Sequence, residues 1–356
     1  MKINRLNFEW IRTFVVIIIA LVFTMIVILL VSNEPMNALK EFLIGPIDSM
    51  RHIGNVIELM IPLIFTGLAV SMMFSAEQFN LAAEGAFFAG AIGAAAIALS
   101  IDLPIIIHPI AAIIGGGVIG ALITGIPAFL KVKWNASELV SSLMFNYLAF
   151  YMGIYVINYF YRDANAGAMV SEKLNMSALL IRLIPRTRIH MGLIIALIFI
   201  AASFYFIYRT KWGYALRITG QNSRFAEYSG INTLRVFLYA QLIGGFIAGV
   251  GGATELLGMY TRFSWQALPG YGWDGIIVAI LARNNPLFVP LAALFLAYLR
   301  IGADIMARMS DVQNEVVALI QGIIIVLVVA ERFLAKYRHR WVYNEAKTSI
   351  SKAEEE

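Results

Sequence analysis

Two acidic residues occur inside stretches of this sequence that are otherwise apolar. Glu84 lies in FNLAAEGAFF and Asp274 lies in GYGWDGIIVAI. In both stretches the acid is followed by a glycine and then by an apolar run. A charge within a membrane-spanning segment is costly and indicates a functional site by default. The alternative is a carboxylate in the first turn of a helix, where it offsets the helix dipole after a break in the chain. The two interpretations are compatible.

A second pair of segments resembles one another in the same way. NASELVSSL at 135–143 is similar to QNEVVALIQ at 313–321, which pairs Glu138 with Glu315. The separations are 190 residues from position 84 to 274 and 177 residues from 138 to 315. Similar but unequal separations predict an internal repeat with an insertion. In transporters, interrupted helices at matching positions of two repeats indicate the substrate path.

Three further side chains that could contact a solute lie at or near membrane depth: Asn80, Asn146 and Trp273. Tryptophan is most often an interfacial anchor, and stacking on a planar ligand is the alternative. We therefore predict one set of residues that lies near a translocation path or holds its broken helices. The set comprises Asn80, Glu84, Asn146, Trp273 and Asp274.

A long polar and basic interval, 209–235, separates apolar runs in the second half of the chain. Asn222 is a favourable N-cap residue and Gly230 a favourable residue to follow a helix end, so a helix of about two turns is predicted between them. Phe225 and Tyr228 share one face of this helix because they are three residues apart. A capped helix with an aromatic face, held between two spans, could dock on a partner. An ordinary solvated surface helix is the alternative.

The composition places the chain among polytopic helical membrane proteins. Hydrophobic residues make up 60% of the sequence and charged residues only 14%, and the mean hydropathy is +0.78. Cysteine is absent and the four histidines have no metal-ligand spacing, so we expect no disulfide, metal site or cofactor. No catalytic motif or P-loop occurs, so we expect a chain that is not an enzyme, and any ATP hydrolysis falls to a partner subunit.

Apolar segments of about 20 residues mark the expected spans. We predict an all-α bundle of about ten spans, with an amphipathic stretch at 36–52. The predicted spans are 13–32, 54–74, 80–100, 104–130, 137–160, 191–208, 236–258, 272–282, 286–302 and 314–331. Two series of small residues at intervals of four predict close helix packing. These are Gly85, Ala89 and Gly93, and Gly244, Ala248 and Gly252.

The basic residues favour one orientation of this bundle. With both termini in the cytoplasm, 17 of the 27 Lys and Arg residues fall on the inner side. We therefore expect a transmembrane domain at 1–335, with 209–235 as a cytoplasmic loop, and a charged cytoplasmic tail at 336–356. The basic loop 161–189, which this orientation places outside, fits the expected excess of Lys and Arg on the cytoplasmic side least well. The positive net charge suits contact with membrane lipids and does not indicate nucleic acid.

Five motifs carry a resemblance to a known family. FNLAAEGAFFAGA, NASELVSSLMFNYLA, ITGQNSRFAEYSGIN, GYGWDGIIVAILARNNPL and NEVVALIQGIII occur in that order between about residues 66 and 330. Together they resemble permease subunits of bacterial ABC importers for branched-chain amino acids, simple sugars and nucleosides. Within that family, the chain is most similar to the nucleoside and simple-sugar permeases. Its departures, such as Ser223-Arg224-Phe225 where proline and small residues are usual, leave the substrate open.

The resemblance implies partners and a coupling segment. It implies a separate ABC ATPase, a second permease subunit that is a paralogue or this same chain, and an external substrate-binding protein, at the bacterial inner membrane. It also implies that 217–232 contains the coupling helix that enters a cleft of the ATPase. The coupling residues are then Gly220, Asn222, Arg224, Phe225, Glu227, Tyr228 and Gly230.

The predicted function is import of a nucleoside or a related sugar-containing solute by alternating access, driven by the ATPase. The same machinery could instead carry riboflavin or a simple sugar. An ion-coupled secondary transporter is the alternative from another class, in which the intramembrane carboxylates would bind the coupling ion.

Overall fold

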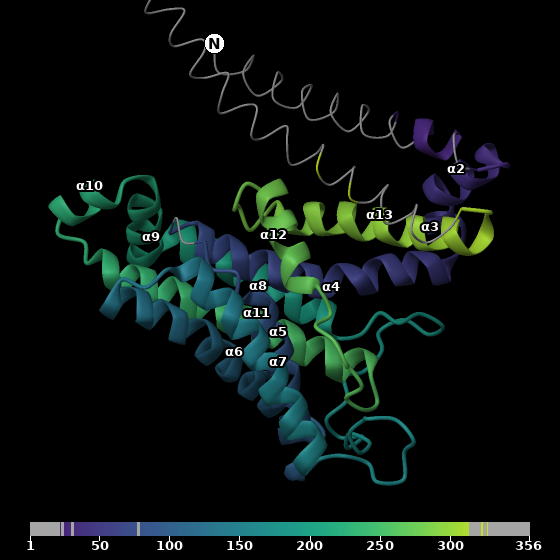
Figure 1. Cartoon of the computed structure of the whole chain (residues 1–356), viewed down its shortest axis with the longest axis horizontal. Coiled ribbons are helices and arrows are strands. Elements are labelled where there is room, and N and C mark those ends of the chain that lie inside the picture. Colours follow the sequence, from purple (N-terminus) through teal and green to yellow (C-terminus); the bar gives the residue numbers. More distant parts are fainter. Residues whose placement is uncertain are drawn as a thin grey trace, which may run out of the picture. The chain divides into compact units, whose positions relative to one another are not determined.

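The computed structural model describes residues 32–76 and 79–312, together with residues 22, 25–29, 322 and 326. Over these residues the chain is helical (Figure 1), and its extended pairings are limited to two isolated bridges, Arg162 with Ser171 and Arg182 with His190. The predicted all-α class is confirmed for the described part of the chain.

Seven helices of the described residues are long and apolar enough to cross a membrane. They are α4 (Met50–Phe74), α5 (Ala83–Ser100), α6 (Ile107–Trp134), α7 (Glu138–Phe160), α8 (Gly192–Arg209), α11 (Thr233–Met259) and α13 (Val289–Met309). The shorter helices are α2 (Pro35–Leu43), α3 (Gly45–Asp48), α9 (Lys211–Gln221), α10 (Ser223–Tyr228) and α12 (Tyr271–Leu281).

These helices agree with the predicted spans between 54 and 258 to within a few residues. The predicted piece 272–282 forms α12, whose 11 residues extend about 16 Å, too little to cross the hydrocarbon core. The piece 286–302 forms α13, which is long enough at 21 residues. The predicted spans 13–32 and 314–331 lie outside the described residues except at 22, 25–29, 32, 322 and 326, and the tail 336–356 lies wholly outside them. The count of ten spans and the orientation of the termini therefore stay predictions.

The chain forms two compact units, residues 49–298 and residues 1–48 with 299–356. In the smaller unit, the predicted amphipathic stretch forms α2 and α3. The carboxylate of Asp311 accepts hydrogen bonds from Ser32 Oγ at 2.5 Å and from the backbone N–H of Asn33 at 2.6 Å. Gly302 lies directly against the carbonyl of Phe42, so the end of α13 packs closely on α2.

The core of the larger unit is built around α11, which packs against α4, α5 and α6. Gly249 of α11 lies against backbone atoms of Gly116 in α6 and Gly90 in α5, where any Cβ would collide. The predicted small-residue packing is confirmed, with different partners for each position. Gly93 faces α6, Gly252 faces the carbonyl of Phe87 in α5, and Gly244 faces α4. Without a hydrophobic driving force between helices in lipid, such close backbone approach supplies the packing energy.

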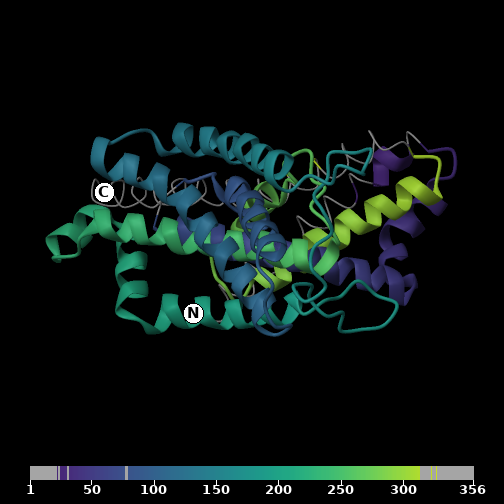
Figure 2. The ribbon, with the colours of Figure 1, turned by 90° about the horizontal axis from the view of Figure 1, so that it is seen from below.

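The two ends of the larger unit differ in structure. Figures 1 and 2 show α9 and α10 at one end and the irregular segment 161–191 at the other. That segment is held on the chain that follows α11: the backbone N–H of Ser171 donates to the carbonyl of Phe263 at 3.0 Å. Asp163 and Arg262 form an ion pair at 3.2 Å in the same region. The basic loop is therefore an ordered layer over the end of α11.

Candidate functional site

The start of α5 meets the start of α12, and the carboxylate of Glu84 joins them. Glu84 lies in the first turn of α5 and is buried. Its Oε1 accepts the backbone N–H of Gly270 at 2.6 Å, and its Oε2 accepts that of Gly272. A Cβ on Gly272 would collide with the backbone of Glu84, which explains why a glycine stands there. Because two helix N-termini converge, a negative charge between them is favourable.

The chain entering α5 is fixed by side chains of α7. Asn146 Oδ1 accepts the backbone N–H of Gly85 at 2.8 Å, and its Nδ2 donates to the carbonyl of Leu81 at 2.9 Å. Ser142 Oγ accepts the backbone N–H of Leu81 at 3.1 Å. Asn80, fully buried, caps this segment by accepting the N–H of Ala82 at 2.8 Å. The backbone groups that an interrupted helix exposes are therefore satisfied by buried amides and a hydroxyl.

The five predicted path residues lie in three different environments. The structure brings Asn80, Glu84 and Asn146 into one site at the start of α5. Asp274 is buried in the first turn of α12, as the dipole interpretation expects. Trp273 is 44% exposed. Asn80 and Asn146 hold the start of α5 and Glu84 holds the start of α12, whereas contact of any of the five residues with a solute stays a prediction.

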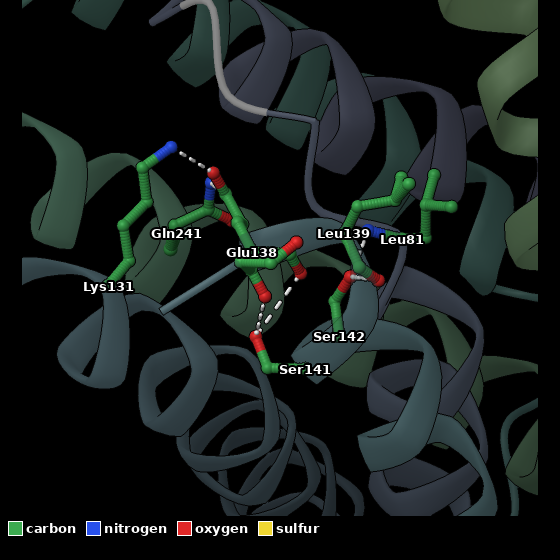
Figure 3. Close-up of polar contacts among 8 residues, drawn as sticks. Leu81, Lys131, Glu138, Leu139, Ser141, Ser142 and Gln241 are labelled. Atoms are coloured by element: carbon green, nitrogen blue, oxygen red, sulfur yellow. Dashed lines mark hydrogen bonds and ion pairs between the residues drawn. The ribbon is translucent and has the colours of Figure 1, made fainter. Parts of the chain in front are cut away.

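A second polar junction ties α6, α7 and α11 together. Figure 3 shows the carboxylate of Glu138, in the first turn of α7, between the side chains of Lys131 and Gln241. Its Oε2 lies 2.7 Å from Lys131 Nζ, and its Oε1 accepts from Gln241 Nε2 at 2.8 Å. The backbone carbonyl of Gln241 in turn accepts a hydrogen bond from Thr124 Oγ1 of α6 at 2.8 Å. The sequence singled out Glu138 only through its similarity to Glu315, and Gln241 not at all. A lone glutamine in the apolar run of α11 was the available signal.

The polar interval 209–235 forms the predicted short helix, α10. Asn222 Oδ1 accepts the backbone N–H of Phe225 at 3.0 Å, which is the predicted N-cap. Gly230 has a φ of +79°. The backbone N–H of Gly230 donates to the carbonyl of Glu227, and that of Ile231 donates to the carbonyl of Ala226, so the helix ends in a Schellman motif. Both predicted caps are confirmed.

The surface of α10 is aromatic and uncovered in this chain. Phe225 is 56% exposed and Tyr228 93% exposed, while Ala226 is buried on the opposite side. Arg224 is also exposed, and the carboxylate of Glu227 accepts a hydrogen bond from Thr233 Oγ1 at 2.8 Å. Gly220, at the end of α9, lies against the carbonyl of Ser75, so no larger residue fits there.

A third buried group was missed by the sequence reasoning. Glu255 of α11 is 1% exposed, and the charge of Glu58 in α4 acts on it. Arg188 acts on Glu58, and the hydroxyl of Tyr260 shares a hydrogen bond with Trp265 beside them. Burial is the main cause that raises the pKa of Tyr260, which follows the last residue of α11. A carboxylate within an apolar helix was the available signal for Glu255.

His190 lies next to this group, just before α8. Burial, with a smaller contribution from Arg182, lowers its pKa to about 4, so the imidazole is neutral at pH 7. Its Nδ1 accepts the backbone N–H of Gly192 at 3.1 Å. Among the residues that the structure describes, no group of three or more His, Asp or Glu side chains could hold a metal ion.

Comparison with known proteins identifies the family. The sequence model described as "Branched-chain amino acid transport system / permease component" matches residues 52–329. The chain is 32% identical to the guanosine ABC transporter permease protein NupP of Bacillus subtilis, over 80% of this chain and 82% of NupP. It is 29% identical to the glucose ABC transporter permease protein TsgB13 of Haloferax volcanii, over 86% of this chain and 83% of TsgB13.

A third relative is the nucleoside ABC transporter permease protein NupB of Lactococcus lactis, 28% identical over 88% of this chain and 90% of NupB. No solved structure gives a significant match. The family match covers most of the chain, including both helix starts, the Glu138 junction and α10. This chain therefore belongs to the family of branched-chain amino acid transport system permease components.

Proposed function

We propose that the chain is the transmembrane permease subunit of an ATP-binding cassette importer that carries a nucleoside or a related sugar-containing solute. The observation that carries the proposal is the 32% identity to a guanosine permease, which extends over 82% of that protein. The nucleoside permease of Lactococcus lactis supports the same substrate class. A simple sugar is the second candidate, because the glucose permease of Haloferax volcanii is similar over as much of its length.

The importer needs partners that supply energy and substrate. A separate ABC ATPase hydrolyses ATP, a second permease subunit completes the pathway, and an external binding protein delivers the solute. The second permease is either a copy of this chain or a paralogue. The complex resides in the bacterial inner membrane, with α9 and α10 in the cytoplasm and segment 161–191 outside.

The α10 helix is the docking element for the ATPase. Its two caps define where the helix begins and ends, and the hydrogen bond from Thr233 to Glu227 ties it to α11. Its exposed face presents Phe225 and Tyr228. Aromatic side chains that are exposed in a free subunit and buried in a complex are the usual anchors of an interface. Because α10 leads directly into α11, a displacement of α10 by the ATPase acts on the central helix of the larger unit.

The translocation path passes the paired helix starts of α5 and α12. Broken helices in transporters place their N-termini at the solute path near the middle of the membrane. Here Glu84 and Asp274 lie at two such starts, and Asn80 and Asn146 hold the approach to one of them. Asp274→Ala should therefore lower uptake while the protein still reaches the membrane. Loss of the protein from the membrane would instead assign Asp274 to folding alone.

Reconstitution tests the proposal directly. The permease, the ATPase and the binding protein encoded beside it are placed in proteoliposomes, and uptake of radiolabelled guanosine, uridine, glucose and riboflavin is measured. Nucleoside uptake that needs all components and ATP is the expected result. Preferential glucose uptake would favour the second candidate. Uptake driven by a proton or sodium gradient without the ATPase would overturn the importer assignment.

A further inference from the structure

Glu255 and Glu58 face one another across the contact between α11 and α4. Gly251 of α11 lies against the side chains of Phe65 in α4 and Phe87 in α5. Glu255 follows Gly251 by four residues, so it lies on the same face of α11 one turn further along. Glu58 precedes Phe65 by seven residues, which places it on the matching face of α4. The two helices run in opposite directions here, since Gly244 of α11 packs on the later turns of α4.

The carboxylate of Glu255 has no hydrogen-bond donor within the described part of the protein. Its side chain is 1% exposed, and both its oxygens lack a partner. The other two buried glutamates discussed above differ, because Glu84 accepts two backbone N–H groups and Glu138 is held by a lysine and an amide. Glu255 is the exception that the helix-start and junction roles do not explain.

Among the described residues, the surroundings of Glu255 supply no compensating positive charge. Glu58 adds a second negative charge, and the Arg188 guanidinium acts on Glu58. The His190 ring lies against Gly258, three residues after Glu255 in α11. Its pKa is lowered to about 4, so the imidazole is neutral at pH 7. The hydroxyl of Tyr260 is engaged with Trp265. These are the titratable and charged groups that reach the pair from α4, from the segment before α8 and from the end of α11.

Two ionised carboxylates cannot share such an environment. Burial disfavours the charged form of an acid, and a neighbouring carboxylate disfavours it further. The pair relieves both effects by keeping one proton, which neutralises one carboxyl and removes the repulsion between the two. Paired acids within transmembrane helices commonly serve as proton sites for this reason.

We propose that Glu58 and Glu255 form a proton-binding site that is occupied while Glu255 is enclosed and is emptied when the adjoining ends of α4 and α11 are opened to water. On occupation, an O–H bond forms between a carboxylate oxygen of the pair and a proton taken from water. On opening, that bond breaks and the proton returns to water, with no oxidation or reduction. The link to transport rests on the proposed importer function, whereas the occupancy of the site does not.

Infrared spectroscopy of the purified full-length permease in lipid nanodiscs tests the occupancy without any substrate. At pH 7.5 the wild-type protein should show the C=O stretching band of a protonated carboxyl, which shifts in heavy water and disappears in Glu255→Gln. Glu58→Gln should keep the band, because the proton then remains on Glu255. The matched control is Glu172→Gln, an exposed acid of segment 161–191, which should leave the band unchanged. A wild-type spectrum identical to that of Glu255→Gln would overturn the proposal.

The pH profile of ATP-driven nucleoside uptake tests the link to transport. Wild-type uptake should fall severalfold as the pH is raised from acidic to strongly alkaline, because the enclosed state then loses its proton. Glu255→Gln mimics the protonated carboxyl permanently, so it should retain uptake at acidic pH and show no such fall. Either an unchanged pH profile or loss of uptake at every pH in this variant would sever the link to transport. The infrared band would decide the occupancy separately, even if the solute proved not to be a nucleoside.

Discussion

Glu84 and Gly272 join two helix starts that are 188 residues apart in the sequence: the carboxylate of Glu84 accepts the buried backbone N–H of Gly272. The same carboxylate accepts the N–H of Gly270. A single side chain thus satisfies donors at the start of α12 while lying in the first turn of α5. The arrangement allows α12 to begin inside the larger unit, and it makes this acid central to the packing of both broken helices.

Removing the Glu84 carboxylate should destabilise the junction in steps. Glu84→Ala leaves both N–H groups without their acceptor, and each unsatisfied buried group costs about 1–3 kcal/mol. Glu84→Gln keeps one carbonyl acceptor but loses the charge. The melting temperature in detergent should therefore decrease in the order wild type, Gln, Ala, and uptake should decrease with it. Glu172→Gln should melt as the wild type does. An unaltered melting temperature in Glu84→Ala would show that these bonds do not hold the helix starts.

Phe225→Asp should separate ATPase docking from membrane insertion. Burying a phenylalanine in an interface contributes about 1.5–3 kcal/mol, and an unpaired aspartate in its place adds a desolvation cost. Because Phe225 is exposed in this chain, the variant should accumulate normally in the membrane. It should nevertheless lose the ATPase on purification or fail to couple hydrolysis to uptake.

Arg224→Ala is the matched control for that experiment. Arg224 is exposed on the same helix, and an exposed ion pair contributes at most about 1 kcal/mol. Co-purification and ATP-dependent uptake should therefore change little. If Phe225→Asp retained the ATPase and full uptake, α10 would not be the docking element.

Removing the Glu138 side chain should destabilise the folded protein more than removing the Lys131 side chain. Glu138→Ala leaves the buried amide of Gln241 without its acceptor, at a cost of about 1–3 kcal/mol. Lys131→Ala costs less, because the lysine side chain is 32% exposed and water partly replaces its contact. Melting temperatures of both single variants and the double variant give the coupling energy of the pair. A Lys131→Ala variant that melts below Glu138→Ala would contradict this ranking.

His190 should make the protein less stable in acid. The unfolded chain binds a proton on this residue below about pH 6.5, whereas the folded chain binds it only near the lowered pKa of about 4. Stability contributed by the neutral imidazole is therefore complete above pH 6.5 and is lost as pH falls from 6.5 toward 4, by up to about 3 kcal/mol. His190→Asn keeps an acceptor for the N–H of Gly192 and does not titrate. Its melting temperature should vary less over this pH range than that of the wild type.

The absence of cysteine allows a direct test of sidedness. Met176 in segment 161–191 is 82% exposed and Tyr228 in α10 is 93% exposed, so a cysteine at either position is accessible to water. An impermeant thiol reagent added outside intact cells should label Met176→Cys and not Tyr228→Cys. Permeabilised cells that lack the ATPase subunit should show labelling of both. Labelling of Tyr228→Cys in intact cells would reverse the proposed orientation.

The sequence by itself determined the helical class, the bounds of six spans to within a few residues, and the short helix α10 with both its caps. These features depend on signals that act within a few residues of one another. Hydropathy over about 20 residues decides whether a segment suits the membrane, and a cap bonds to the backbone of its own turn. Asn222 and Phe225 are bonding partners three residues apart, which is why the sequence was sufficient there.

The tertiary structure alone decided what the buried polar groups do. The sequence offered Glu84 as either a path residue or a dipole partner, and the helix start that it satisfies comes from 186 residues away. It gave no reason to pair Gln241 with Glu138, which are 103 residues apart, or Glu255 with Glu58. The physical reason is that a buried carboxylate is stabilised or destabilised by whichever groups the crossing helices bring to it. Those crossings are set by close contacts such as Gly249 on Gly116, and no local pattern specifies them.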